Sequence, residues 1–342
     1  MKVIAFDNDP DLQGLFMEAA RGIYSGDTGW LGDSATGRLG VEDADPLRRH
    51  FLAMDGSRIL GRVSAAINPA LREMHGPAYA QLGQFECVDD VAAARALIQE
   101  AIGWLRQAAP ASKTLLAPMD LDTWHAYRLR TGGFDEASFP MEPYNPAYYP
   151  ALFAALGFAP VVRYVTKTVN DPAIPMQAWE ASYKRATRRG YRFRSFDGGN
   201  RPGEMLQIHG LSREMFCRNP FYVDISLAEF ARMYAGEAGQ LDTELFVFML
   251  DPQGETVGFA FASPDRRRHD LVNIKTFGTL PRVHGLGAGA ALAMEVYRRA
   301  IRRGFTRINH CLMRAGNEAD LMDRGGARVT REYTLYSKAM SE

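Results

Sequence analysis

Glycines recur at alternate positions in one stretch of the chain, IKTFGTLPRVHGLGAGAAL, between a β-rich run and a helical run. Gly285, Gly287 and Gly289 leave the backbone N–H groups accessible, because no side chain stands between those groups and a bulky anion. The helix that follows adds the positive end of its dipole. This spacing predicts a cradle for a diphosphate group.

Two other phosphate-binding motifs also place glycines between a strand and a helix, and neither fits this sequence. A dinucleotide-binding fold needs its motif after the first strand of a βαβ unit, with an acidic residue about 20 positions later. Here several β-hairpin strands precede the glycines, and the next strand is RINHCLM. A P-loop needs Gly-Lys-Ser or Gly-Lys-Thr, and that sequence does not follow.

Two side chains near this turn could move a proton. His310 lies in the strand TRINHCLM, and because an imidazole titrates near neutral pH, it could be a general base or simply a packed histidine. Asp265, in SPDRRRHD, could bind or deprotonate an ammonium group, or it could belong to a turn. Cys311 follows His310 directly. Adjacent residues of a strand face opposite sides, so a nucleophilic Cys–His pair is not expected.

The elements that must position these residues follow one order twice along the chain. The first half begins with a strand, KVIAF, which is followed by a β-hairpin around Asp55-Gly56 and by a further strand, AYAQLGQFEC. A helix then follows Asp90. In the second half, LFVFML and TVGFAFAS are strands joined by a turn at 251–254, LVNIKTFGTL is a strand, and a helix follows the glycines. The repeated order predicts a duplicated α+β domain.

A chain of 342 residues is longer than one hydrophobic core usually supports, so two domains are expected. We place a first lobe at residues 1–170, a linker helix at 171–189 and a second lobe at 190–342. The first lobe has Val88-Asp89-Asp90 where the second has glycines. Two carboxylates at a helix N-terminus would repel a diphosphate, so only the second lobe is expected to bind one.

Composition narrows the partners and the compartment. The 40 basic and 40 acidic residues cancel, so no bulk attraction to nucleic acid or to an anionic membrane is expected. Three cysteines without metal-ligand spacing favour a reducing compartment, and no metal site is predicted. The first residues do not resemble a signal peptide, and no apolar run reaches about 18 residues. We therefore expect a cytoplasmic protein that acts on a small molecule.

With Thr279-Leu280-Pro281 before the glycines, this segment resembles the acetyl-CoA motif of the GNAT acetyltransferases. The region from Asn317 through Gly325-Gly326 to YTLYSK resembles the closing segment of the same family. The first half resembles a GNAT lobe in its element order, and nearly the whole chain resembles bacterial tandem-GNAT proteins. The resemblance implies two lobes in tandem, each a mixed, mostly antiparallel twisted sheet flanked by helices.

The resemblance also implies where acyl-CoA would bind in the second lobe. Pantetheine would lie along the backbone of Phe277, Gly278 and Thr279 in a splayed sheet, with Asn317 near the pantetheine arm. The glycine turn would hold the diphosphate through His284, Gly285, Leu286, Gly287, Ala288, Gly289 and Ala290. Two positions depart from the family pattern: His284 stands where Arg or Gln is usual, and Met322 stands where a tyrosine often serves as general acid.

The expected reaction is transfer of an acetyl or other acyl group from CoA to a primary amine of a small molecule by direct attack, with acyl-CoA as co-substrate. Two alternatives stay open at this point. The donor could be a carrier-protein thioester or an aminoacyl-tRNA, although a carrier protein would leave the nucleotide contacts unused. The protein could instead be a non-catalytic CoA-binding sensor, because Met322 replaces the tyrosine and the first lobe has no cradle.

Overall fold

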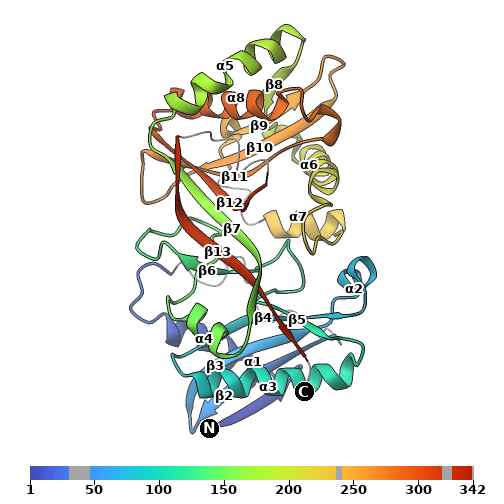
Figure 1. The fold of residues 1–342 in the computed structure, drawn as a ribbon, viewed down its shortest axis with the longest axis vertical. Coiled ribbons are helices and arrows are strands. Elements are labelled where there is room, and N and C mark those ends of the chain that lie inside the picture. Colours follow the sequence, from blue (N-terminus) through green and yellow to red (C-terminus); the bar gives the residue numbers. More distant parts are fainter. Residues whose placement is uncertain (31–46, 236–240, 318–325, 341–342) are drawn as a thin grey trace. The chain divides into compact units, whose positions relative to one another are not determined.

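The computed structural model describes residues 1–30, 47–235, 241–317 and 326–340 (Figure 1). The chain divides into two compact units. Unit 1 contains Met1–Arg163, Pro220–Val223 and Arg331–Glu342, and unit 2 contains Tyr164–Asn219 and Asp224–Thr330. This division differs from the predicted lobes at the C-terminus, because the residues from Arg331 onwards pair with strands of unit 1.

Unit 1 is built around a mixed sheet with the strand order β1-β2-β3-β4-β5-β13. The parallel pair is β4 with β5, whereas β1 with β2, β2 with β3, β3 with β4 and β5 with β13 are antiparallel. The predicted hairpin joins β2 to β3, and Gly56 adopts a φ of 58° there. The strands are β1 (Lys2–Phe6), β2 (Arg48–Asp55), β3 (Arg58–Ala66), β4 (Tyr79–Cys87), β5 (Thr114–Ala117), β6 (Leu129–Gly132), which also pairs with β13, and β13 (Ala327–Ala339).

Helices α1 (Pro10–Ile23) and α3 (Val91–Ala108) pack on opposite faces of this sheet. On β2, Phe51 and Ala53 join the apolar cluster formed with α3, whereas Leu52 packs with Phe16 of α1. Successive side chains of a strand point to opposite faces, so this one buried strand anchors both helices. Helices α2 (Pro69–His75) and α4 (Tyr149–Ala155) complete the unit among its described residues.

Buried ion pairs in unit 1 tie the C-terminal strand to the sheet. Glu142 is 1% exposed, and its carboxylate lies 3.2 Å from Nε of Arg331 and 3.9 Å from Nη1 of Arg130. Tyr333 also donates a hydrogen bond to Glu142. Arg331 and Tyr333 belong to β13, and Arg130 belongs to β6. One carboxylate therefore balances two buried guanidinium groups on neighbouring strands.

Unit 2 has the same plan, with the strand order β7-β12-β11-β10-β9-β8. The parallel pair is β11 with β12, and the other neighbours are antiparallel. The predicted turn between β9 and β10 closes with a hydrogen bond of 3.0 Å from the Gly254 N–H to the Asp251 carbonyl. The strands are β7 (Ala159–Val169), which begins in unit 1, β8 (Arg192–Ser195), β9 (Phe246–Leu250), β10 (Thr256–Pro264), β11 (Leu271–Thr279) and β12 (Arg307–Arg314).

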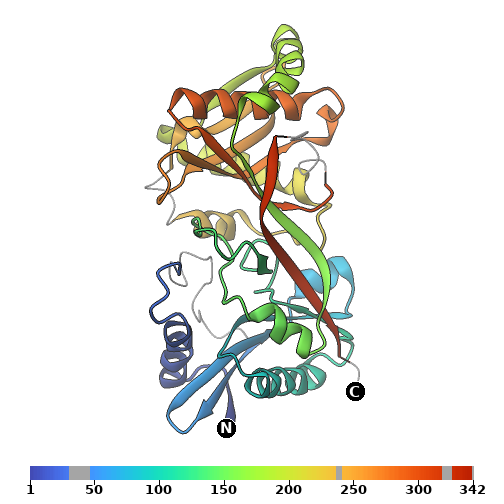
Figure 2. The same cartoon turned by 60° about the vertical axis from the view of Figure 1, so that its left-hand side comes forward.

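Helix α8 (Ala288–Arg302) lies against the sheet of unit 2, and α5 (Ala173–Arg188) packs on α8 (Figures 1 and 2). Trp179 of α5 meets Tyr297 of α8 edge-on, with ring centroids 5.0 Å apart. Tyr183 of α5 donates a hydrogen bond of 2.8 Å to Glu295 of α8. The segment predicted as a linker helix is therefore packed onto unit 2.

Helix α6 (Arg201–Phe216) approaches the sheet of unit 2 at β11. A side chain added to Gly278 would come within 2.9 Å of the Met215 sulfur, so a larger residue here would require the Met215 side chain to move. Phe277, the preceding residue, packs instead into the apolar cluster that contains α8. Helix α7 (Leu227–Ala235) follows α6 along the chain. The sheet of unit 2 thus lies between α8 on one face and α6 on the other.

The structure confirms the α+β class and the repeated order of strands and helices. The sequence pattern did not predict the short elements α2, β6 and α7. Residues 318–325, which belong to the segment that resembles the family's closing segment, lie outside the described residues. The three cysteines are free thiols, as expected. Within the described ranges, none of the helices has both the length and the apolar character that crossing a bilayer requires.

We expect Glu142→Gln to destabilise unit 1 by about 3–5 kcal/mol, because it leaves two buried guanidinium groups without their shared counter-charge. Urea unfolding followed by tryptophan fluorescence checks this, since Trp30, Trp104 and Trp124 of the four tryptophans lie in unit 1. Glu180→Gln, in an exposed pair with Lys184, is the control and should leave the unfolding midpoint unchanged. Equal midpoints for the two variants would show that the buried pair contributes nothing.

Candidate functional site

The two parallel strands of unit 2 separate part-way along their length. β11 and β12 pair from Leu271 with Arg307 to Ile274 with His310, and both strands then continue beyond the last pair. On β11, Lys275 is an extra residue in the register with β10, which makes a β-bulge directly after the last pair. On β12, Leu312 has a φ of 58°. Both strands therefore change course just past the last pair, which produces the splay that the resemblance implied.

The glycine turn follows β11 directly and leads into α8. Gly285 and Gly287 have φ values of 75° and 81°, a backbone region that favours glycine. Gly287 is the N-cap of α8 and carries no side chain that could bond the helix start. His284, Gly285 and Leu286 are exposed, and Gly287, Gly289 and Ala290 are partly so. The first-turn N–H groups of a helix have no partner within the helix, so this turn can offer them to an external anion.

Helix α5 contributes a cation beside this turn. A side chain added to Gly287 would lie 3.1 Å from the Ser182 hydroxyl and 3.4 Å from Nη2 of Arg185, so both groups border the glycine. Arg185 also donates a hydrogen bond of 3.3 Å to the Ser182 hydroxyl. The Arg185 side chain is exposed and forms no ion pair within the described part of the chain. Its charge is therefore available near the helix start.

His284 is oriented back towards the strand. Its Nε2 donates a hydrogen bond of 2.9 Å to the carbonyl oxygen of Thr279, the last residue of β11. The side chain that replaces the usual Arg or Gln thus braces the turn between strand and helix. This contact supports the shape of the cradle, and the nearby positive charge comes from Arg185 on a different helix.

In unit 1, the corresponding helix start is closed by the chain itself. Asp90 is the N-cap of α3, and its Oδ1 accepts hydrogen bonds from the N–H groups of Ala92 (2.7 Å) and Ala93 (3.2 Å). An anion at this helix start would have to displace the carboxylate and would be repelled by it. The two units therefore share an order of elements but differ in what satisfies the helix start.

The free edge of β4 in unit 1 is also occupied. Val88 donates to Leu60 of β3, so the neighbouring Cys87 directs its backbone groups to the other edge. There the Cys87 N–H donates to the Tyr149 hydroxyl (2.9 Å), and the Tyr148 hydroxyl donates to the Cys87 carbonyl (2.8 Å). Further along the edge, the Met119 N–H donates to the Leu82 carbonyl (2.7 Å). The aromatic segment around Tyr148 thus fills the edge of this strand.

His310 lies on β12 at the last paired position and forms a close hydrogen bond with α8. Its Nε2 is 2.6 Å from the hydroxyl oxygen of Tyr297. Burial and, to a smaller extent, the charge of Lys167 on β7 together lower the pKa of His310 from its ordinary 6.5 to about 4. The imidazole is therefore neutral at pH 7. Cys311 lies near Asn273 on the opposite face, as the sequence predicts.

Asp265 holds a turn and a buried amide network. Its Oδ1 accepts hydrogen bonds from the N–H groups of Arg267 (2.9 Å) and Arg268 (3.0 Å). Its Oδ2 accepts from the side-chain amide of Asn273 (3.1 Å), and Asn273 in turn accepts from Asn309 of β12 (2.8 Å). Both carboxylate oxygens are committed to the fold, which matches the turn interpretation of the sequence.

The other predicted residues lie along the same strand end and turn. Phe277, Gly278 and Thr279 form the part of β11 beyond its last pair with β12, and the residues from His284 to Ala290 follow them. Asn317 lies after β12, where its N–H donates to the Arg314 carbonyl (3.2 Å). Met322 falls outside the described residues. The structure thus gathers the cradle residues and leaves Asp265 in a separate turn.

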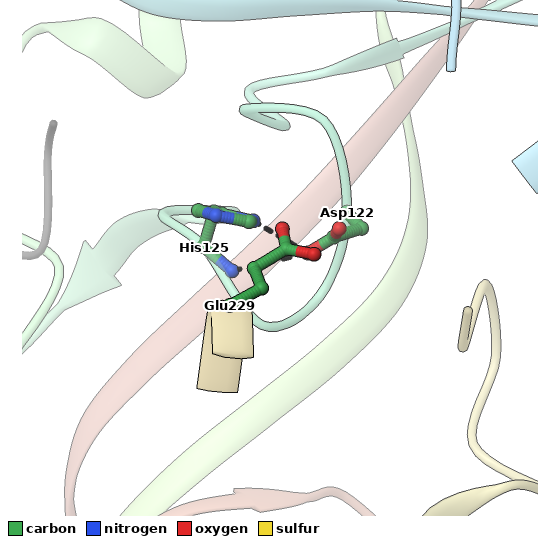
Figure 3. A group of neighbouring side chains, drawn as sticks. All are labelled: Asp122, His125 and Glu229. Atoms are coloured by element: carbon green, nitrogen blue, oxygen red, sulfur yellow. Dashed lines mark hydrogen bonds and ion pairs between the residues drawn. The ribbon is translucent and has the colours of Figure 1, made fainter. Parts of the chain in front are cut away.

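Unit 1 contains a His–Asp pair that the sequence analysis did not identify. Oδ1 of Asp122 accepts hydrogen bonds from Nδ1 of His125 (2.8 Å) and from the N–H of Trp124 (2.8 Å) (Figure 3). The spacing Asp-x-x-His could have suggested the pair, because a turn brings such residues together. The contact fixes the proton of His125 on Nδ1. Glu229, which Figure 3 also labels, belongs to unit 2.

Comparison with known proteins gives a family match for one part of the chain and a similar fold for nearly all of it. Residues 213–320 match the model of the acetyltransferase (GNAT) family. The fold is similar to a GCN5-related N-acetyltransferase from Sphaerobacter thermophilus (14% identity, TM-score 0.53, covering 99% of this chain and 96% of that one). It is also similar to a tandem GNAT protein from the clavulanic acid biosynthesis pathway (11%, 0.56, covering 100% and 99%). A GCN5-related N-acetyltransferase from Anabaena variabilis is a third example (13%, 0.55, covering 99% and 73%). No curated protein matches the chain.

The lowered pKa of His310 predicts an acid-sensitive unit 2. Between pH 6.5 and about 4 the unfolded chain binds a proton at His310, whereas the folded chain does not. The free energy of unfolding therefore falls as the pH falls. The slope contributed by this residue should reach about 1.4 kcal/mol per pH unit. Urea unfolding at several pH values checks it, and His310→Gln should flatten the curve in this window. An unchanged slope in that variant would contradict the prediction.

Proposed function

We propose that this chain is a member of the GNAT superfamily and that unit 2 is an N-acyltransferase that moves an acetyl or other acyl group from CoA to a primary amine of a small molecule. The family and the fold give acyl transfer in general terms. CoA as donor, the amine as acceptor and the cytoplasm as compartment are the finer parts of the proposal. Three free thiols suit a reducing compartment.

One observation carries the choice of donor: the helix start of unit 2 is left open where that of unit 1 is closed. Gly287 has no side chain to cap α8, whereas Asp90 bonds two N–H groups of α3. An uncapped helix start is costly unless something else satisfies it. The diphosphate of CoA suits the need, because it is anionic and because Arg185 stands next to Gly287.

The strand end of β11 suits the rest of the donor. Beyond the last pair with β12, the backbone of Phe277, Gly278 and Thr279 can pair with an extended pantetheine arm, as a neighbouring strand would. A backbone N–H near the end of this strand can then meet the carbonyl oxygen of the thioester. This arrangement would bring the acyl group to the splay, where both strands change course.

The transfer itself needs no covalent enzyme intermediate. The lone pair of a neutral amine attacks the thioester carbonyl carbon, a C–N bond forms, and negative charge builds on the carbonyl oxygen. The C–S bond then breaks and the thiolate leaves. The amine loses one proton and the thiolate gains one, so the products are an amide and free CoA. Cys311 faces away from His310, which agrees with direct attack.

We expect titration with acetyl-CoA to give one binding event per chain with micromolar affinity, because α8 of unit 2 starts without a side-chain cap whereas Asp90 caps the corresponding helix α3 of unit 1. Gly287→Glu should abolish the binding, since a carboxylate at this position repels the diphosphate and meets Ser182 and Arg185. Asp90→Gly is the matched control in unit 1 and should leave both affinity and stoichiometry unchanged, because Tyr148 and Tyr149 still fill the edge of β4 that leads to this helix. Isothermal titration calorimetry measures all three proteins.

The outcomes separate the proposed donor from the alternatives. Absence of heat in the unaltered protein would overturn CoA as donor and favour a thioester carried by another macromolecule. Binding without release of free thiol, across a panel of primary amines, would favour a sensor. Release of thiol that depends on both the amine and Gly287 would support the acyltransferase.

Arg185 should matter for donors that carry phosphates and for no others. We expect Arg185→Ala to weaken acetyl-CoA binding about five- to tenfold, because a charge-assisted contact to phosphate is lost. Acetyl-pantetheine has no diphosphate, so its KM should be the same in both proteins. Lys184→Ala is the control, since the Lys184 ammonium already pairs with Glu180 at 2.7 Å. An equal loss in the control would show a general effect of charge.

A further inference from the structure

The Tyr297–His310 pair lies where the opening between β11 and β12 begins. His310 forms the last pair of the parallel register, with Ile274, and both strands diverge beyond it. The 2.6 Å contact to Tyr297 joins this position to the middle of α8. Tyr297 is itself held by Trp179 of α5, whose ring meets it edge-on. The imidazole is therefore fixed at the closed end of the opening.

The hydrogen bond sets which ring nitrogen carries the proton. A phenol with a pKa of about 10 is a far stronger hydrogen-bond donor than a neutral imidazole, so Tyr297 donates and Nε2 of His310 accepts. The proton of the neutral ring then lies on Nδ1. Among the described residues, Lys167 on β7 and the Tyr297 hydroxyl on α8 face the ring, and the charge of Lys167 disfavours an imidazolium.

The position of Nδ1 follows from the covalent structure of the side chain. Nε2 is at the tip of the ring and reaches α8, so Nδ1 lies closer to Cβ and hence to strand β12. His310 remains partly exposed in spite of these contacts. An N–H donor is thus held near the plane of the sheet, on the strand opposite the Phe277–Thr279 backbone.

From this geometry we propose that His310 is a catalytic hydrogen-bond donor, in which Nδ1–H stabilises the negative charge on the sulfur of the departing thiolate, and that Tyr297 is the positioning residue that fixes this tautomer. The inference rests on the proposed function. When the C–S bond breaks, its electron pair goes to sulfur, and His310 stays neutral throughout. The proton lost by the amine and the proton gained by the thiolate pass through solvent, so the step balances without another reactant.

This assignment replaces the role of general base that the sequence suggested for His310. A base must accept a proton, and both burial and Lys167 oppose a positive charge on this ring. A donor must only keep its N–H directed at the reacting group, which the Tyr297 contact ensures. The resemblance aligns Met322 with the tyrosine that often serves as general acid. Stabilising the departing thiolate is therefore left to another residue.

Four variants test the proposal through thiol-release kinetics across pH. His310→Leu removes the donor and should lower kcat about 100-fold, the usual effect of losing one such donor, with no change in acetyl-CoA affinity. His310→Asn keeps an N–H close to the Nδ1 position and should retain kcat within about tenfold. Tyr297→Phe should lower kcat severalfold, because without the hydroxyl the proton of the His310 ring can also lie on Nε2. Cys311→Ala, on the opposite face of the same strand, is the control and should behave as the unaltered protein.

Nitrogen NMR of the free protein gives a reading that does not depend on turnover. Uniform ¹⁵N labelling of the seven histidines, with His310 assigned from the spectrum of His310→Asn, should show a proton on Nδ1 between pH 6 and 8. A proton on Nε2, or a ring that gains a proton in this range, would overturn the proposal.

Kinetics would overturn it if His310→Asn were as inactive as His310→Leu and both lost the same limb of the pH profile, because that pattern belongs to a base. A failure of the proposed function looks different. The unaltered protein would then release no thiol with any amine, whereas turnover that is insensitive to His310→Leu would overturn only this inference.

Discussion

The unmet hydrogen bonds at the start of a helix are the constraint on which the difference between the two units depends. A helix leaves its first N–H groups without internal partners, and a folded chain must satisfy them or expose them to water or a ligand. In unit 1 the Asp90 carboxylate accepts hydrogen bonds from two of these N–H groups. Unit 2 begins its helix at Gly287 and supplies no side chain for them. A missing cap lowers stability, and an uncapped helix start beside the Arg185 cation is suited to an anionic ligand.

The same logic extends from the helix start to the strand edge. In each unit one parallel pair of strands diverges, which leaves backbone groups of the central strand to be satisfied by something other than the neighbouring strand. Unit 1 fills this edge from within, through the hydroxyls of Tyr148 and Tyr149 and the backbone of Met119. These contacts turn one unit into a closed scaffold. Among the described residues, the corresponding helix start and strand end of unit 2 are not filled in this way, which is the basis for proposing an elongated, anionic ligand there.

A feature could be predicted from the sequence where its interacting residues lie close together in the chain. The glycine turn and the Asp90 cap are local, so their consequences for the two helix starts could be read from adjacent residues. The hairpin at Gly56 and the turn at Gly254 are local too. The hydrogen-bond partners of Tyr148 and His310, and the glycine turn beside Arg185, belong to other elements, so no spacing rule could find them. The place of β13 depends on the buried Glu142, nearly 190 positions away from Arg331 in the chain.

The two side chains that the sequence suggested for proton abstraction, Asp265 and His310, are both poorly suited to it, for different reasons. Asp265 uses both oxygens to hold a turn and an amide network, and His310 is kept neutral by burial and by Lys167. A site arranged in this way favours an acceptor amine that arrives uncharged, because neither group is suited to remove its proton. In the proposed reaction the fraction of acceptor in the free-base form would then limit the rate, and the task left to the protein would be to stabilise the negative charge that moves from the carbonyl oxygen to sulfur.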